Sequence, residues 1–159
     1  MDIIERLSKL SLFNNLKNDK ELLAKIATIM TTEKFMPGKY IIKEGDTGDK
    51  MFILNKGTVR VEKKTLAGDK FTVVVLSDYM NIFFGELALM DNDVRSASVV
   101  ADTDVECYSI KKDDFEKFCE EHPLLGYNIT KEIAKLMSAR LRKSTVDTIY
   151  LIDAFVNEE

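Results

Sequence analysis

The chain has 159 residues, enough for one domain with a single core and too few for a second full domain. Apolar residues make up 45% and charged residues 31%, which is typical of a folded globular protein, and the net charge of −4 argues against a broad basic surface for nucleic acid. No run of about 18 apolar residues appears, and the first ten residues lack the apolar core of a signal peptide. We therefore expect a cytoplasmic protein that binds neither DNA nor a membrane.

The first 34 residues predict a small helical bundle. Asn18 and Glu21 have the spacing of a capping box, which predicts the start of a second helix there. Apolar residues recur at helical spacing in two stripes: Ile3, Ile4, Leu7 and Leu10 in the first, and Leu22, Leu23, Ile26, Ile29 and Met30 in the second.

Residues 35–111 change to short β-rich runs that alternate with glycine turns. Short strands at this spacing favour an antiparallel sandwich or roll. The predicted fold class is therefore mainly β with flanking α-helices, an antiparallel β-roll of the double-stranded β-helix or jelly-roll type. The runs that predict strands are 40–42, 51–54, 58–61, 71–76, 97–100 and 105–110.

Residues 112–159 return to a helical pattern. Asp113 and Glu116 have capping-box spacing, and Pro123 predicts a break between two helices. Apolar residues continue through Leu141, and residues 148–156 repeat the pattern as a final helical segment. This stripe is also a candidate seam for a homodimer.

Residues 84–98 carry the most specific chemistry: FGELALM at 84–90 is followed by RSAS at 95–98. Gly85 opens a single helical turn whose first amides are unpaired, and it allows the backbone to come close to an anion. Arg95 can place two N–H groups on phosphate oxygens, and Glu86 can accept from a sugar hydroxyl. Ser96 can donate to a phosphate or to a base edge.

This segment resembles the phosphate-binding cassette of the cyclic-nucleotide-binding domain family, which includes the catabolite activator protein and the regulatory subunits of protein kinase A. The resemblance extends upstream over residues 35–54 and 57–61 and downstream over 113–142. It implies a β-roll between N-terminal helices and C-terminal hinge and lid helices, with the hinge near residues 121–125. It also implies a cyclic nucleotide ligand, cyclic AMP (cAMP) before cyclic GMP (cGMP).

Carried over to this sequence, the resemblance assigns the ribose 2′-OH to Glu86 and the cyclic phosphate to Arg95. Leu136 and Arg140 are the candidates on the lid helix, with Arg140 stacking on the purine or bonding to it. The full predicted site comprises Phe84, Gly85, Glu86, Leu87, Ala88, Arg95, Ser96, Ala97, Leu136 and Arg140.

Two departures from the family pattern stand out. Asn81 occupies the place where relatives usually have glycine, and asparagine is the other residue that best tolerates a positive φ. Only residues 143–159 follow Arg142, and these are too few for the DNA-binding helix-turn-helix domain of catabolite-activator relatives. We therefore expect no DNA-binding domain.

The sequence favours a non-enzymatic sensor that signals to an unidentified downstream protein through its C-terminal helices. Neither catalytic nor metal-binding residues are expected: His122 is the only histidine, and Cys107 and Cys119 form no C-x-x-C. Two alternatives stay open. One is an interaction module with this fold whose pocket no longer binds nucleotide, and the other is a metal-dependent enzyme of the cupin type.

Overall fold

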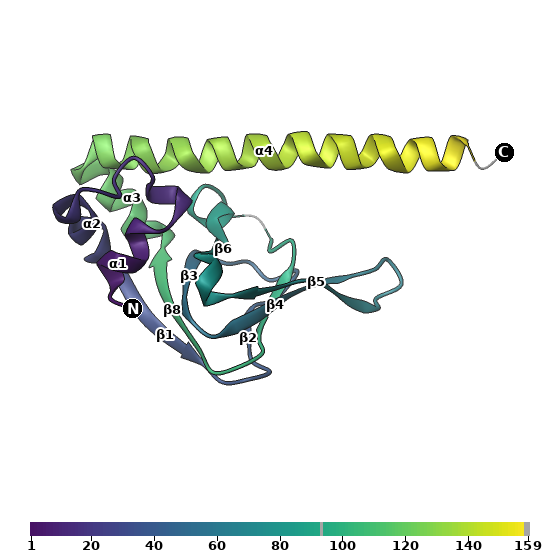
Figure 1. The fold of residues 1–159 in the computed structure, drawn as a ribbon, viewed down its shortest axis with the longest axis horizontal. Coiled ribbons are helices and arrows are strands. Elements are labelled where there is room, and N and C mark those ends of the chain that lie inside the picture. The colour runs from purple at the N-terminus through teal and green to yellow at the C-terminus, as the bar shows by residue number, and fades with distance from the viewer. Residues whose placement is uncertain (93, 158–159) are drawn as a thin grey trace.

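The computed structural model describes residues 1–92 and 94–157. Two four-stranded antiparallel sheets form a roll, helices gather at one end of it, and one long helix runs along its side (Figure 1). This confirms the predicted fold class. The first sheet has the order β1-β8-β3-β6, from Met30–Phe35, Val105–Lys111, Lys50–Lys56 and Phe83–Phe84. The second has the order β2-β7-β4-β5, from Tyr40–Ile42, Ser98–Ala101, Thr58–Lys64 and Lys70–Ser77.

Strand β3 shows how the sequence builds the core. Its run Met51–Leu54 is apolar without interruption, because both faces of the strand are buried. Met51 and Ile53 pack against the helices, whereas Phe52 and Leu54 point into the roll. Inside the roll, Phe52 stacks on Phe84 with ring centroids 5.7 Å apart, so the strand that precedes the cassette is anchored in the core.

The N-terminal segment contains helices α1 (Ile3–Ser8) and α2 (Lys20–Ala27), with the short turn η1 (Ser11–Phe13) between them. Asp19, not Asn18, caps α2, because its side chain accepts a hydrogen bond from the amide of Leu22 at 3.0 Å. Strand β1 begins at Met30, earlier than the predicted start of the roll at residue 35. The reason is tertiary: Met30–Phe35 pairs along its whole length with β8.

The C-terminal segment contains α3 (Lys112–Glu121) and α4 (Pro123–Val156), and the predicted break at Pro123 is confirmed. Asp113 lies in the first turn of α3 rather than at its N-cap, which is Lys111. The predicted final segment 148–156 is the last part of α4, one continuous helix of 34 residues. Among the described residues, no helix is both long and apolar enough to cross a membrane.

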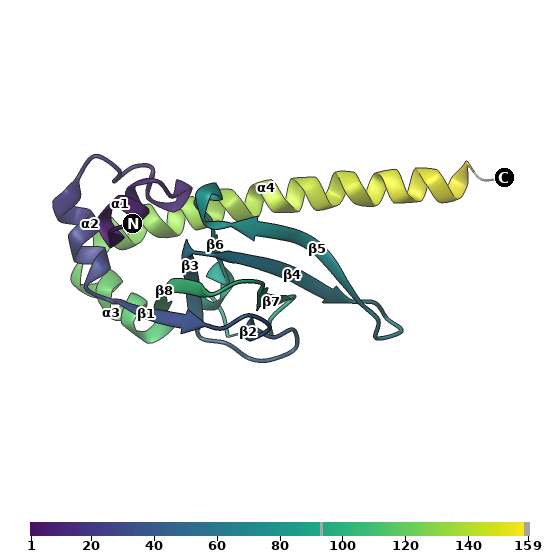
Figure 2. The same cartoon turned by 60° about the horizontal axis from the view of Figure 1, so that its bottom comes forward.

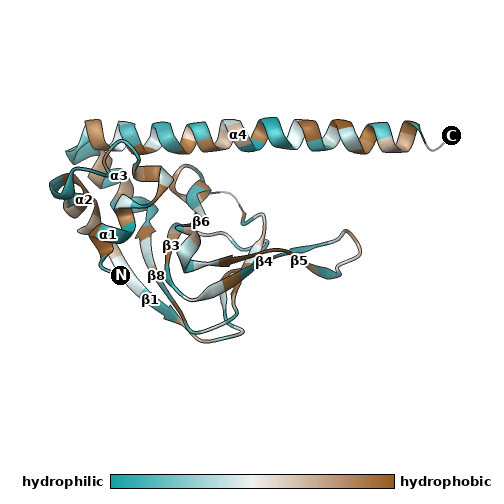
Figure 3. Cartoon of the chain, in the orientation of Figure 1, coloured by the Kyte–Doolittle hydropathy of each residue, from teal (hydrophilic) through white to brown (hydrophobic). Residues whose placement is uncertain are grey.

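Helix α4 extends well beyond the roll, as the two views show (Figure 2). Its first half packs into the core through Leu125, Ile129 and Ile133. Its second half is exposed and still carries apolar residues, as the hydropathy colours show (Figure 3). Leu141 and Phe155, for example, are 70% and 77% exposed. The helix therefore has one half fixed to the domain and one half with apolar side chains in solvent.

Candidate functional site

The segment that carries the candidate chemistry forms a tight turn between the two sheets. Strand β6 ends at Phe84, and the 3-10 helix η3 (Glu86–Leu89) begins two residues later. Gly85 between them has φ 75°, a left-handed conformation that disfavours other residues. A Cβ atom there would lie 2.8 Å from Nη1 of Arg95 and 3.1 Å from the carbonyl oxygen of Lys50. Glycine is therefore required both by the turn and by the close approach of Arg95.

Arg95 reaches this turn from the segment before β7. Its Nη2 donates to the carbonyl of Lys50 at 2.6 Å, and its Nη1 donates to the carbonyl of Gly85 at 3.2 Å. Gly48 lies against the Nε side of the guanidinium, because a Cβ atom at this residue would be only 2.2 Å from Nε. These contacts fix the guanidinium between the backbone of the cassette at Gly85 and the backbone at the start of β3.

The charge of Arg95 is partly removed from water. Burial lowers the pKa of Arg95, while the carboxylates of Asp49 and Glu86 act in the opposite direction. A guanidinium stays protonated at physiological pH in any case, and two of its five N–H groups bond to the carbonyls. The result is a half-buried cation with planar donors, which suits a small anion with several oxygens.

Glu86 is 2% exposed and lies one residue after the turn glycine. Its Oε1 forms an ion pair with Nη1 of Arg140 on α4, a side chain that is itself 54% exposed. The pair joins the cassette to the long helix across a sequence separation of 54 residues. A carboxylate has room for further hydrogen bonds, so Glu86 can accept from a ligand hydroxyl while it keeps Arg140.

Arg95, Glu86 and Arg140 all line one cavity of about 450 Å³. The lining includes every residue of the predicted site except Leu136, which is half-buried on α4. Ser96 is exposed at this cavity and Ala97 is half-buried. Sequence reasoning missed the opposite wall, and the only signal for it was the β-rich composition of strands that looked purely structural. That wall is apolar and comes from the four strands of the second sheet, β2, β4, β5 and β7, through Ile42, Val61, Val74, Leu76 and Val99.

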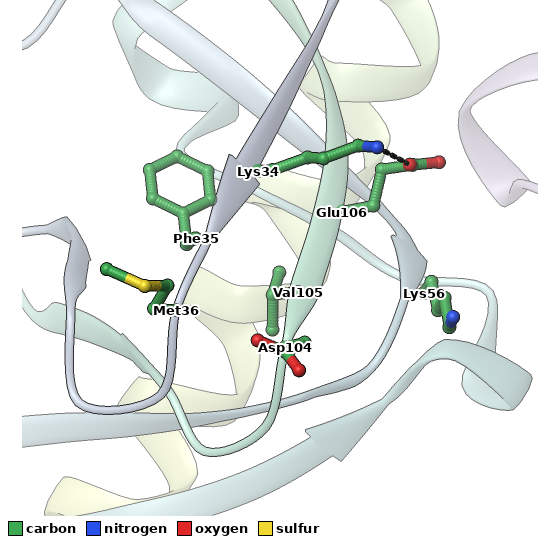
Figure 4. A pocket seen from close by; sticks show the side chains of 7 residues that line it. All are labelled: Lys34, Phe35, Met36, Lys56, Asp104, Val105 and Glu106. Carbon is green, nitrogen blue, oxygen red and sulfur yellow. Dashed lines mark ion pairs between the residues drawn. The ribbon is translucent and has the colours of Figure 1, made fainter.

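A second hollow, of about 370 Å³, has a different character (Figure 4). Lys34 and Glu106 form an ion pair there at 3.6 Å, so the charges partly satisfy each other. Met36, Lys56 and Asp104 also line it.

No group of three His, Cys, Asp or Glu side chains in the described part of the chain could hold a metal ion. The cavity at Arg95 therefore remains the best candidate site.

Comparison with known proteins gives the family. A family model described as "Cyclic nucleotide-binding domain" matches residues 32–122. The chain belongs to the cyclic nucleotide-binding domain family. The matched range includes the whole cassette and both sheets apart from the first two residues of β1, and the family model describes a ligand-binding domain.

Individual relatives of this cyclic nucleotide-binding domain are parts of different kinds of protein. Human cGMP-dependent protein kinase 2 is 38% identical over 112 residues, which cover 70% of this chain and 14% of the kinase. The catabolite activator protein of Thermus thermophilus is 28% identical with a TM-score of 0.77, covering 89% of this chain and 62% of that one. The regulatory subunit of a cAMP-independent protein kinase A from Trypanosoma cruzi, bound to guanosine, is 27% identical with a TM-score of 0.68; 91% of this chain and 48% of that one are covered.

The departure at Asn81 leaves the domain's turn intact. Asn81 has φ 51° and ends the short turn η2 (Asp78–Met80) in the left-handed conformation. It is the one non-glycine residue with a positive φ in the described ranges. The prediction that asparagine can replace glycine here is confirmed.

Proposed function

We propose that this domain binds a cyclic purine nucleotide in the cavity at Arg95 and acts as a non-enzymatic sensor in the cytoplasm. Three groups that line one cavity support the proposal: a half-buried guanidinium, a buried carboxylate and an apolar wall. A cyclic nucleotide has the matching groups, which are an anionic phosphodiester, a ribose hydroxyl and a flat purine.

The phosphate is assigned to Arg95 and to the backbone of the turn at residues 85–87. The guanidinium is pre-positioned by its two carbonyl contacts, so little side-chain freedom is lost when an anion binds. A singly charged diester matches the half-buried guanidinium of Arg95, because each charge then compensates the other. Leu87, Ala88 and Ala97 line the same cavity.

The ribose is assigned to Glu86 and the purine to the apolar wall that includes Val74 and Leu76. We propose cAMP as the preferred ligand and cGMP as the second candidate. The preference between the two nucleotides depends on Ser96, because its hydroxyl can also accept a hydrogen bond from the exocyclic amino group of guanine. Both nucleotides therefore have to be compared in the same titration.

Helix α4 is proposed to act as the lid and to carry the signal to a downstream protein. The ion pair between Arg140 and Glu86 supports this role, because it already holds α4 across the cavity. Nucleotide binding would then shift a pre-existing equilibrium between capped and open positions of the helix. The hinge would lie near His122, where α3 ends and α4 begins.

Replacing Arg140 with alanine is expected to weaken nucleotide binding by about 3- to 10-fold, because Glu86 and the purine lose a contact that is only partly desolvated. Isothermal titration calorimetry measures the change. Arg142→Ala is the matched control, since it removes a cation of the same kind two residues away. Equal affinities for the wild type and Arg140→Ala would place α4 outside the ligand mechanism.

The exposed half of α4 is proposed as the seam of a homodimer. Ile149, Ile152 and Phe155 lie there at helical spacing and are each more than half exposed. Light scattering coupled to size exclusion should give twice the chain mass for the wild type. The double variant Ile152→Lys, Phe155→Lys should give a monomer, and a wild-type monomer at all concentrations would contradict the seam.

Calorimetric titration of the purified protein with cAMP, cGMP and guanosine tests the function itself. We expect saturable heat with at least one cyclic nucleotide and weaker binding of guanosine, which lacks the phosphate for Arg95. An absence of heat at submillimolar ligand would favour the alternative, an interaction module that binds no nucleotide. The cAMP-independent relative from Trypanosoma cruzi is the reason to keep that alternative.

A further inference from the structure

In the described part of the chain, two charged residues are buried: Glu86 in the site and Arg6 on α1. Arg6 is 2% exposed, although arginine is one of the residues that proteins bury least often. It lies outside the cavity at Arg95. A buried guanidinium is retained only where its donors are satisfied, so its partners indicate what it does.

The partners of Arg6 come from two other parts of the fold. Nη2 donates to the carbonyl of Asn55 at 2.7 Å, and Nε reaches Oδ1 of the same residue at 3.4 Å. Nη1 donates to the carbonyl of Asp78 at 2.7 Å and to Oδ1 of Asn81 at 2.9 Å. These acceptors are carbonyl oxygens and not carboxylates, so the guanidinium organises backbone and amide groups. It thereby links α1 to the end of β3 and to the turn η2.

The turn that Arg6 holds connects two parts of the chain that line the cavity at Arg95. Leu76, on the apolar wall, lies two residues before η2, and Phe84 and Gly85 follow soon after Asn81. The turn depends on the left-handed conformation of Asn81, which is unfavourable for a residue with a Cβ atom. The hydrogen bond from Nη1 of Arg6 to Oδ1 of Asn81 restrains the side chain of this residue. The amide of Leu54 donates to the carbonyl of Ile82 at 3.1 Å. This bond joins the residue after the turn to β3, next to the pairing of β3 with β6.

We propose that Arg6 is a positioning residue for the nucleotide site. It fixes the turn at residues 78–81, and through this turn it sets the place of Gly85 and Glu86 relative to the apolar wall. The inference rests on the proposed function, and it gives the N-terminal helix a part in binding that the cassette sequence does not indicate.

Arg6→Met keeps much of the side-chain bulk but removes the donors. We expect it to weaken nucleotide binding by about 3- to 30-fold in calorimetry. Leu7→Ala is the control, because Leu7 is fully buried on the same helix and packs into the helical core. Both variants should lower the Tm. A loss of affinity in Arg6→Met no larger than in Leu7→Ala would overturn the proposal.

Asn81→Gly is a second variant that should fold readily, since glycine tolerates the required φ. It removes the acceptor while it leaves Arg6 in place. If Arg6 acts through Asn81, the double variant Arg6→Met, Asn81→Gly should bind about as weakly as Arg6→Met alone. If the double variant instead loses as much binding free energy as Arg6→Met and Asn81→Gly lose together when measured singly, Arg6 does not act through this turn.

Amide hydrogen exchange of the ligand-free protein separates this proposal from the proposed function. Arg6→Met should speed exchange at residues 82–87 more than Leu7→Ala does, whether or not the wild type binds nucleotide. Unchanged exchange there would contradict the positioning role. Accelerated exchange together with a wild type that binds no nucleotide would overturn the proposed function and leave the structural role of Arg6 supported.

Discussion

Replacing Arg95 with alanine is expected to lower the affinity for cyclic nucleotide by roughly 30- to 4000-fold. The range corresponds to about 2 to 5 kcal/mol, the cost of leaving one partner of a desolvated charge pair unpaired. Arg95 is half-buried and its pKa is lowered by burial, so water compensates for its loss only in part. Calorimetry with the preferred nucleotide measures the change.

Two controls make the Arg95 experiment specific. Ser96→Ala changes the next residue, which is exposed and offers one neutral hydroxyl, and its loss of affinity should be much smaller. Arg95→Lys keeps the charge but lacks the planar donors that reach Lys50 and Gly85 together, so its affinity should lie between those of wild type and Arg95→Ala. Equal losses in Arg95→Ala and Ser96→Ala would refute the assigned roles.

Replacing Glu86 with glutamine is expected to weaken binding by about tenfold or more. The shape of the side chain is kept, but a charged acceptor for the ribose hydroxyl becomes a neutral one. Arg140 also loses its ion-pair partner, and because that side chain is half exposed, the effect on the Tm should be small. Calorimetry gives the affinity and thermal unfolding gives the Tm.

The 2′-deoxy form of the nucleotide shows whether Glu86 acts on the ribose. Wild-type protein should lose affinity when the 2′-OH is removed, whereas Glu86→Gln should lose much less, because the contact is already weakened. The same loss in both proteins would mean that Glu86 does not accept from the 2′-OH. Its buried carboxylate would then serve mainly to hold Arg140 and α4.

Several features of the fold and the site could be predicted because they depend on short stretches of the amino-acid sequence. Gly85, Glu86 and Arg95 could be placed in one binding segment because turn, acceptor and cation lie within eleven residues of each other. The same holds for the break at Pro123, where the ring excludes helix continuation, and for the left-handed turn at Asn81. Each of these follows from the covalent and hydrogen-bonding properties of a few neighbouring residues.

Other features could not be predicted in this way, because they depend on how distant segments of the chain pack together. Strand β1 begins at Met30 because β8 pairs with it, although the local pattern read as helix. The apolar wall faces the cassette, Arg140 pairs with Glu86, and Arg6 holds the turn at Asn81 only because distant segments pack together. Periodicity tells which face of a helix or strand is apolar, but not which element that face will meet. Packing of the core sets the register of α4 against the roll. This register places Arg140, and not Leu136, in the lining of the cavity.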